Sequence, residues 1–169
     1  MNLKNLLFKS QSRKMKLIYI LILSITLIET KLYAKEEILE SSVNNEVRKL
    51  ENKNRDIFRN PIQTLSFFGI RPDDTVLEIL PGKGYYSEIL SLYLKEKGKF
   101  YVASFGDNHP IEPLRKIEKN YREYFNQKKS IFGNINIKDF KNISYLNGIK
   151  SNSMDKIFTF RNNHNWIYS

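Results

Sequence analysis

The sequence predicts an α/β domain built on a parallel sheet that is flanked by helices. Short apolar segments rich in β-branched and aromatic residues alternate with longer amphipathic segments, and turns containing Gly, Pro, Asn or Asp separate them. This alternation is typical of strand–helix–strand units, which place successive strands in parallel. The length of 169 residues and a hydrophobic content of 41% suit a single folded domain.

The clearest strand–turn–helix unit lies in the middle of the chain. Residues 75–80 form an apolar segment between two turn sequences, so we expect a strand there. The turn 81–84 contains Pro and two Gly residues, and residues 85–96 follow it with helical spacing. Residues 99–104 are expected to form the second strand. The inward face of the helix is predicted to consist of Ile89, Leu90, Tyr93 and Leu94.

A further helix and two further strands are predicted towards the carboxyl end. Pro110 begins the helix, and the pair Glu118–Arg122 has the i,i+4 spacing of an ion pair on its solvent face. Residues 135–140 and 156–160 are expected to be the third and fourth strands. The inward face of this helix is predicted to consist of Ile111, Leu114, Ile117, Tyr121 and Phe125.

The residues before the first strand are predicted to be helical as well. Residues 35–54 are charged, with apolar residues at near-helical spacing, so we expect a solvated, peripheral helix. Residues 62–68 suit a short apolar helix that ends at Gly69. The expected organisation is therefore an N-terminal segment 1–34, the peripheral helix, and one partial domain over 55–169.

Residues 1–34 have the organisation of a secretory signal peptide. Six basic residues and one acidic residue give this segment half of the net charge of +10. They flank an apolar run, 17–28, and Leu32-Tyr33-Ala34 ends in a small residue at the expected cleavage position. We expect an exported, periplasmic protein, and an uncleaved anchor in the inner membrane is the alternative. Met15 is an alternative start.

The composition excludes several classes of site. The chain has no Cys, which excludes a disulfide scaffold, thiolate metal sites and a Cys nucleophile. His109 and His164 are its two His residues, so no metal site is expected, although Asp107 lies close to the first. After residue 34 the basic residues form no compact run with interleaved aromatics, so no nucleic-acid binding is expected. Membrane contact is expected only through the N-terminal segment, and the oligomeric state is left open.

The most informative motif is the junction at residues 76–84, Val-Leu-Glu-Ile-Leu-Pro-Gly-Lys-Gly. Ligands of open α/β sheets bind at the carboxyl ends of the strands, and Gly allows a close backbone approach. Glu78 suits a ligand with a cationic or hydrogen-bond-donating group better than a pyrophosphate. The dinucleotide motif is incomplete because Ser87 stands in place of its third Gly, and no Ser or Thr follows Gly-Lys as in a P-loop. A purely structural turn with a solvated Glu78 is the other alternative.

This junction resembles the first motif of S-adenosylmethionine-dependent methyltransferases. The resemblance covers most of residues 48–166 and is closest to a group of exported bacterial proteins named as predicted class I methyltransferases. The blocks that carry it are Arg55-Asp56 with Arg59-Asn60-Pro61, residues 65–70, residues 76–86 and residues 159–166.

The resemblance implies a Rossmann-like class I methyltransferase fold, S-adenosylmethionine as the cofactor, and an unidentified small molecule or protein as the methyl acceptor. The implied cofactor-binding residues are Glu78, Pro81, Gly82, Gly84, Ser104, Arg161 and Asn162. Asn165 and Trp166 are the implied substrate residues, with core anchoring as the alternative for Trp166. His164 is the candidate general base, and orientation of Trp166 is its alternative role.

The chain departs from the family pattern at three points. Leu80 stands where most methyltransferases have their first loop Gly, and Ser104 replaces the acid that usually holds the ribose hydroxyls. The resemblance implies seven strands in the order 3-2-1-4-5-7-6, whereas the chain to Ser169 offers four. We therefore expect a truncated product whose fourth strand is an exposed sheet edge.

Two functions of different classes follow from the sequence. The first is a methyltransferase-like protein, which is an active enzyme unless the expected truncation has inactivated it. The alternative is a non-catalytic exported or membrane-tethered binding protein that retains a Rossmann-like half-fold. Arg55, Asp56 and Arg59 lie one helical turn apart, which suits either a lid over the cofactor or an Asp–Arg pair within the helix.

Overall fold

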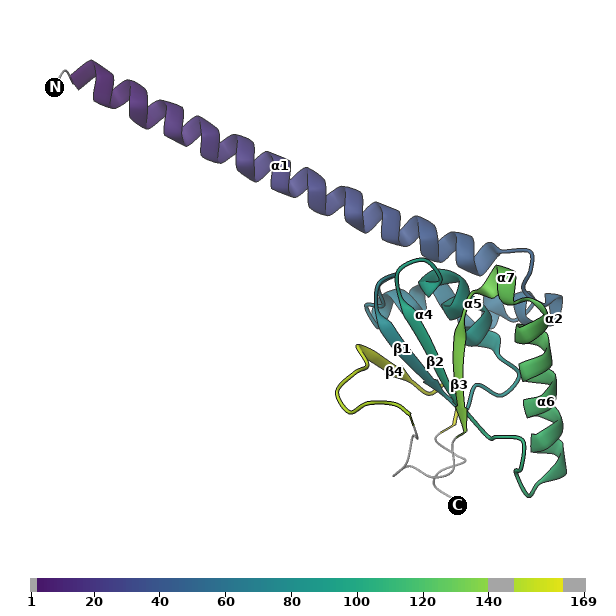
Figure 1. The fold of residues 1–169 in the computed structure, drawn as a ribbon. Coiled ribbons are helices and arrows are strands. Elements are labelled where there is room, and N and C mark those ends of the chain that lie inside the picture. The colour runs from purple at the N-terminus through teal and green to yellow at the C-terminus, as the bar shows by residue number, and fades with distance from the viewer. Residues whose placement is uncertain (1–2, 140–147, 163–169) are drawn as a thin grey trace. The chain divides into compact units, whose positions relative to one another are not determined.

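The computed structural model describes residues 3–139 and 148–162 (Figure 1). The chain divides into two compact units, Met1–Glu37 and Ile38–Ser169. Helix α1, Leu3–Asn44, begins in the first unit and ends in the second.

The first unit contains an exposed apolar helix. Within the described residues, the stretch Met15–Asn44 is long and apolar enough to cross a membrane, and its apolar window is not buried. The apolar run 17–28, predicted from the sequence, is helical throughout and exposed along its length. Such a helix near an N-terminus suits a signal sequence and a membrane anchor alike, and it leaves the compartment undetermined.

The second unit is an α/β domain with a four-stranded, all-parallel sheet in the order β3-β2-β1-β4. This order matches the first four strands that the resemblance implies. Each predicted strand is present, and the fourth is two residues shorter than expected at its carboxyl end. The strands are β1 Thr75–Ile79, β2 Lys99–Ser104, β3 Ile135–Asp139 and β4 Lys156–Phe158.

Strand β4 forms one edge of the sheet among the described residues, as predicted. It pairs with β1 through residues 156–158, and Ile157 is exposed. Strand β1 is central, because Glu78 lies between Val102 of β2 and Phe158 of β4 in the register. The carboxyl end of β1 therefore has a neighbouring strand on each side.

Helices flank the sheet (Figure 1). The two longer ones are α5, Tyr85–Leu94, and α6, Glu112–Gln127. Helix α5 begins directly after Gly84, which adopts a left-handed conformation with φ of 83°. The shorter helices are α2 Leu50–Lys53, α3 Asp56–Arg59, α4 Pro61–Phe67 and α7 Lys129–Phe132.

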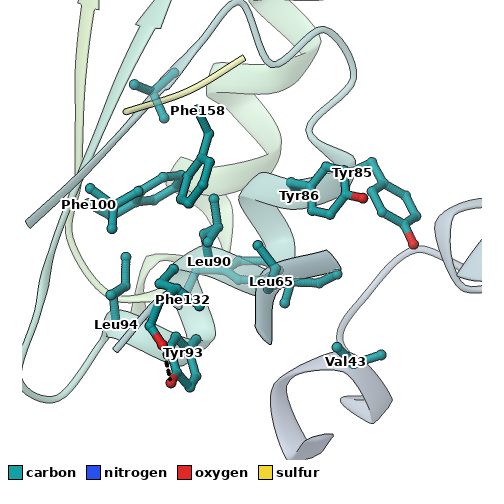
Figure 2. Close-up of a cluster of buried hydrophobic side chains, with 14 of the residues drawn as sticks. Val43, Leu65, Tyr85, Tyr86, Leu90, Tyr93, Leu94, Phe100, Phe132 and Phe158 are labelled. Carbon is teal, nitrogen blue, oxygen red and sulfur yellow. Dashed lines mark hydrogen bonds between the residues drawn. The ribbon is translucent and has the colours of Figure 1, made fainter. Parts of the chain in front are cut away.

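One hydrophobic core joins the sheet to these helices (Figure 2). Helix α5 buries its predicted inward residues, and Phe100 and Phe158 contribute from the strands. The end of α1 adds Leu39 and Val43 to the same core. Leu39 and Val43 are therefore packed into the domain, in contrast to the solvated helix expected over 35–54, because they meet a partner surface that charge patterning does not reveal. The expected helix is also interrupted, since α1 ends at Asn44 and α2 begins at Leu50.

Helix α6 differs from its prediction in which face is buried. Tyr121 and Phe125 are buried as expected, but Ile111 is exposed and Glu118 is buried. The predicted ion pair between Glu118 and Arg122 is present, at 2.5 Å. It does not lie on the solvent face, because the Glu118 side chain is buried. The buried carboxylate is tolerated because it accepts hydrogen bonds from both Arg122 and Ser104.

Candidate functional site

A pocket of about 440 Å³ lies at the carboxyl end of β1. Ligand sites in proteins typically have volumes of this order, and open α/β sheets bind ligands at this edge. Two turns and the segment around α3 contribute to its wall. The described lining residues are Arg55, Arg59, Glu78, Leu80, Pro81, Gly82, Lys83, Tyr85, Tyr86, Phe160 and Asn162.

Glu78 provides the acidic group of the pocket. Its side chain is almost fully buried, and one of its carboxyl oxygens accepts a hydrogen bond of 2.6 Å from the Ser87 hydroxyl. Burial raises the pKa of Glu78 to about 7, against the opposing effects of the Ser87 hydrogen bond and the positive charge of Arg59. Glu78 is therefore not the solvated carboxylate of a purely structural turn, and its charge changes near neutral pH.

The turn after β1 has a backbone suited to glycine at two positions that line the pocket. Gly82 has a φ of 60°, and a Cβ added there would meet no atom within 4 Å. Leu80 has a φ of 51°, so a non-glycine residue occupies a left-handed conformation. This conformation costs a non-glycine residue about 1–2 kcal/mol. Leu80 thus has a backbone conformation that glycine adopts more readily, while its side chain contributes to the pocket wall.

Gly84 serves packing and does not line the pocket. A Cβ at this position would lie 3.0 Å from Tyr121 and 3.1 Å from Phe125, both on α6. The residue also has a φ of 83°, which a side chain would strain. Gly84 therefore lets α6 pack closely against the start of α5, which explains its presence without a ligand.

The segment after β4 closes one side of the pocket. The Asn162 amide donates hydrogen bonds to the carbonyl oxygens of Ile79 and Leu80, at 3.2 and 3.0 Å. Phe160 stacks on Tyr86 of α5 with ring centroids 3.7 Å apart. Asn162 therefore holds the segment against the β1 turn, and the two rings add an apolar wall.

Two arginines at the ends of α3 also line the pocket, Arg55 directly before the helix and Arg59 as its last residue. The guanidinium carbon of Arg59 lies 4.4 Å from the centre of the Tyr85 ring, and that of Arg55 lies 5.5 Å from it. Asp56 lies between them in sequence but pairs with Arg48. The intrahelical Asp–Arg pair considered as an alternative is therefore not how this carboxylate is used.

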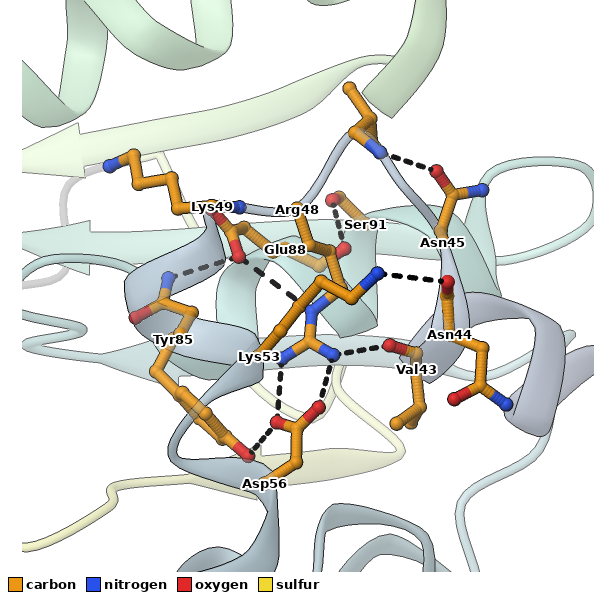
Figure 3. A network of polar contacts seen from close by, with 12 residues as sticks. Val43, Asn44, Asn45, Arg48, Lys49, Lys53, Asp56, Tyr85, Glu88 and Ser91 are labelled. Carbon is orange, nitrogen blue, oxygen red and sulfur yellow. Dashed lines mark hydrogen bonds and ion pairs between the residues drawn. The ribbon is translucent and has the colours of Figure 1, made fainter.

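A buried polar network holds the segment around α3 in place (Figure 3). Arg48 binds both carboxylate oxygens of Asp56, each at 2.9 Å, and also donates to the Val43 carbonyl oxygen. The Tyr85 hydroxyl donates to Asp56 at 2.5 Å. Glu88 of α5 lies 3.7 Å from Nε of Arg48. Burial alone would lower the pKa of Arg48, but the carboxylates raise it, so this arginine stays charged.

The predicted site residues are only partly brought together. Glu78, Pro81, Gly82 and Asn162 line the pocket, whereas Gly84, Ser104 and Arg161 do not. The Ser104 hydroxyl donates to Glu118 at 2.6 Å and is buried. Arg161 is exposed. His164, Asn165 and Trp166 lie outside the described residues, so their predicted roles stay predictions.

Several pocket residues were not predicted as ligand contacts, notably Lys83, Tyr86 and Phe160. Lys83 and Phe160 are adjacent to predicted residues and Tyr86 lies two residues after Gly84, so proximity to the Gly-rich turn and to the end of β4 is the signal that finds them. Within the described residues, no cluster of His, Asp and Glu is suited to hold a metal ion.

The chain matches no family model in a scan of protein families, and a search of the curated proteins finds no match either. The fold and the pocket define an α/β domain with a four-stranded parallel sheet, preceded by an apolar N-terminal helix.

Proposed function

We propose that this protein is an S-adenosylmethionine-dependent methyltransferase-like protein whose cofactor binds in the pocket at the end of β1. The observation that carries the proposal is the pairing of a buried carboxyl, Glu78, with an open approach over Gly82. Both lie at the edge of the sheet where ligands of this class of fold bind. The strand order and the sequence blocks around the β1 turn add support.

The pocket fits the amino-acid end of S-adenosylmethionine better than its nucleoside end. Glu78 suits the ammonium group, and Gly82 leaves room for the ligand beside the backbone. The usual acidic contact to the ribose has no counterpart at the end of β2, because Ser104 there is bonded to Glu118. We therefore assign cofactor contacts to the β1 turn and to the aromatic wall of Tyr86 and Phe160.

S-adenosylmethionine supplies an electrophilic methyl group on its sulfur. The residues of this chain have the tasks of orientation and of excluding water, which lower the barrier to transfer between two bound molecules. Asn162 maintains the pocket by holding its wall to the carbonyl oxygens after β1.

The second candidate function is a non-catalytic binding protein with the same half-sheet. The engagement of Ser104 with Glu118 favours it, because a nucleoside without a ribose contact is held less firmly. The two candidates differ in whether the bound ligand is S-adenosylmethionine at all.

Substitution of Gly82 by valine is expected to abolish binding of S-adenosylmethionine and S-adenosylhomocysteine. The added side chain would fill the open space over the turn. Isothermal titration of the full-length chain in non-ionic detergent micelles measures both ligands. Absence of saturable binding to the folded wild-type protein would refute the proposed cofactor.

Gly69→Val is the matched control. Gly69 has a φ of 64°, close to the 60° of Gly82, and likewise has no atom within 4 Å of an added Cβ. It is not among the described lining residues of the pocket. Both variants therefore carry similar backbone strain, and only Gly82→Val should lose the ligand. Equal loss in both variants would point to unfolding, and retained affinity in Gly82→Val would place the ligand elsewhere.

A further inference from the structure

The pocket carries an excess of positive charge. Arg55, Arg59 and Lys83 line it, and Glu78 is the one acidic group among its described lining residues. Burial lowers the pKa of Arg59, and the positive charge of Arg55 lowers it further. Arg161 is close enough to contribute in the same direction. The part of the pocket wall formed by these basic groups therefore attracts an anionic group.

Arg59 has a buried donor that the described part of the protein leaves unsatisfied. Its Nε is shielded from solvent and has no hydrogen-bond partner there. The guanidinium lies over the Tyr85 ring at 4.4 Å and near the Tyr86 ring at 5.9 Å. Aromatic faces attract the cation but offer its N–H groups no in-plane acceptor. Buried donors normally have partners, so this Nε is suited to a ligand acceptor.

The carboxylates near Arg59 are committed to other partners. Asp56 binds Arg48 and Tyr85 (Figure 3). Glu78 accepts from Ser87 and is only partly ionised at neutral pH. The positive charge of the two pocket arginines is therefore not balanced by an ion pair of their own among the described contacts.

We propose that Arg55 and Arg59, together with Lys83, form an anion-binding site that takes a carboxylate or phosphate group of the methyl acceptor. Arginine binds such groups through paired, charge-assisted hydrogen bonds. S-adenosylmethionine has a sulfonium and an ammonium group against one carboxylate, so its net charge is positive and an anionic acceptor would offset the charge of the shared pocket. The identity of the anion as an acceptor rests on the proposed function, whereas anion binding at Arg59 does not.

The first test follows the Nε–Hε signal of Arg59 by NMR in the ¹⁵N-labelled full-length chain in non-ionic detergent. Inorganic phosphate and acetate are the probes, titrated at constant ionic strength with chloride as the reference salt. We expect a saturable shift of the Arg59 signal, assigned through its loss in Arg59→Gln. Arg71, which already pairs with Asp74 at 2.9 Å, is the internal control. No shift beyond that in chloride, or an equal shift of Arg71, would overturn the anion site.

The second test separates the acceptor from the carboxylate of the cofactor itself. S-adenosylhomocysteine has that carboxylate and 5′-methylthioadenosine lacks it. If the site serves the acceptor, Arg59→Gln changes the affinities for S-adenosylhomocysteine and 5′-methylthioadenosine by the same factor, and phosphate strengthens S-adenosylmethionine binding to the wild type. A loss of tenfold or more for S-adenosylhomocysteine alone would overturn the acceptor assignment. A saturable phosphate shift without any cofactor binding would refute the proposed function and leave the anion site standing.

Discussion

Replacement of Arg48 by methionine is expected to lower the free energy of unfolding by about 3–5 kcal/mol. The buried guanidinium of Arg48 makes a bidentate ion pair with Asp56, and Glu88 lies nearby (Figure 3). Methionine fills much of the same volume but leaves the two carboxylates without their cation. Most of the loss arises from those uncompensated charges and not from the missing attraction itself. Urea unfolding followed by circular dichroism measures the change.

Lys119→Met is the control for this substitution. Lys119 pairs with Glu123 at 3.9 Å, and the two side chains are 74% and 54% exposed. Exposed pairs contribute roughly 0–1 kcal/mol, so the control should remain close to the wild type. Equal losses in the two variants would contradict the view that burial of the Arg48 network determines its importance.

The Arg48 network also links stability to the pocket. Asp56 is adjacent to Arg55 and lies in the same short helix as Arg59, and its carboxylate is held between Arg48 and the Tyr85 hydroxyl. The Tyr85 ring in turn lies against both pocket arginines. The loop between α1 and α2, through Arg48, therefore helps to position the groups proposed to bind an anion.

Much of the fold was predictable because it follows from local patterns. Each strand is an apolar segment between turn residues, and the parallel arrangement follows from the helices between them. Glu118 shows where this reasoning fails. Sequence reasoning assigns Glu118 to the solvent face because the residue is charged. Its burial depends on hydrogen bonds from Ser104, which is 14 residues away, and from Arg122.

Local sequence patterns predicted the candidate site only where its residues are close in sequence, whereas Asn162 was named through the family resemblance. Glu78 and Gly82 belong to one strand–turn–helix junction, so a single motif identifies both. The partnership of Arg48 with Asp56 and Glu88 joins the loop after α1 to α3 and α5, and no local pattern distinguishes these residues from surface charges. Leu80 is a further case, because its backbone is left-handed, a conformation that its residue type does not predict.

Glu78→Gln is expected to be more stable than the wild type at pH 8 by about 3 kcal/mol. The ordinary pKa of the Glu78 carboxyl is 4.5, and burial raises it to about 7 in the folded protein. Between these values the unfolded chain has lost the proton and the folded chain retains it. The wild type therefore loses stability as pH rises from about 4.5 to 7, and the loss is complete above that range.

Glutamine removes this pH dependence while its side-chain oxygen can still accept the hydrogen bond from Ser87. The measurement is the difference in unfolding free energy between variant and wild type at pH 5 and at pH 8, in which the other titrating groups cancel. We expect the difference in unfolding free energy to grow by most of the 3 kcal/mol between pH 5 and pH 8. A difference that is the same at both pH values would show that Glu78 ionises in the folded protein as it does in the unfolded chain.

The same substitution should weaken binding of S-adenosylmethionine most at pH 8, where the wild-type carboxylate carries its charge and faces a cationic ligand.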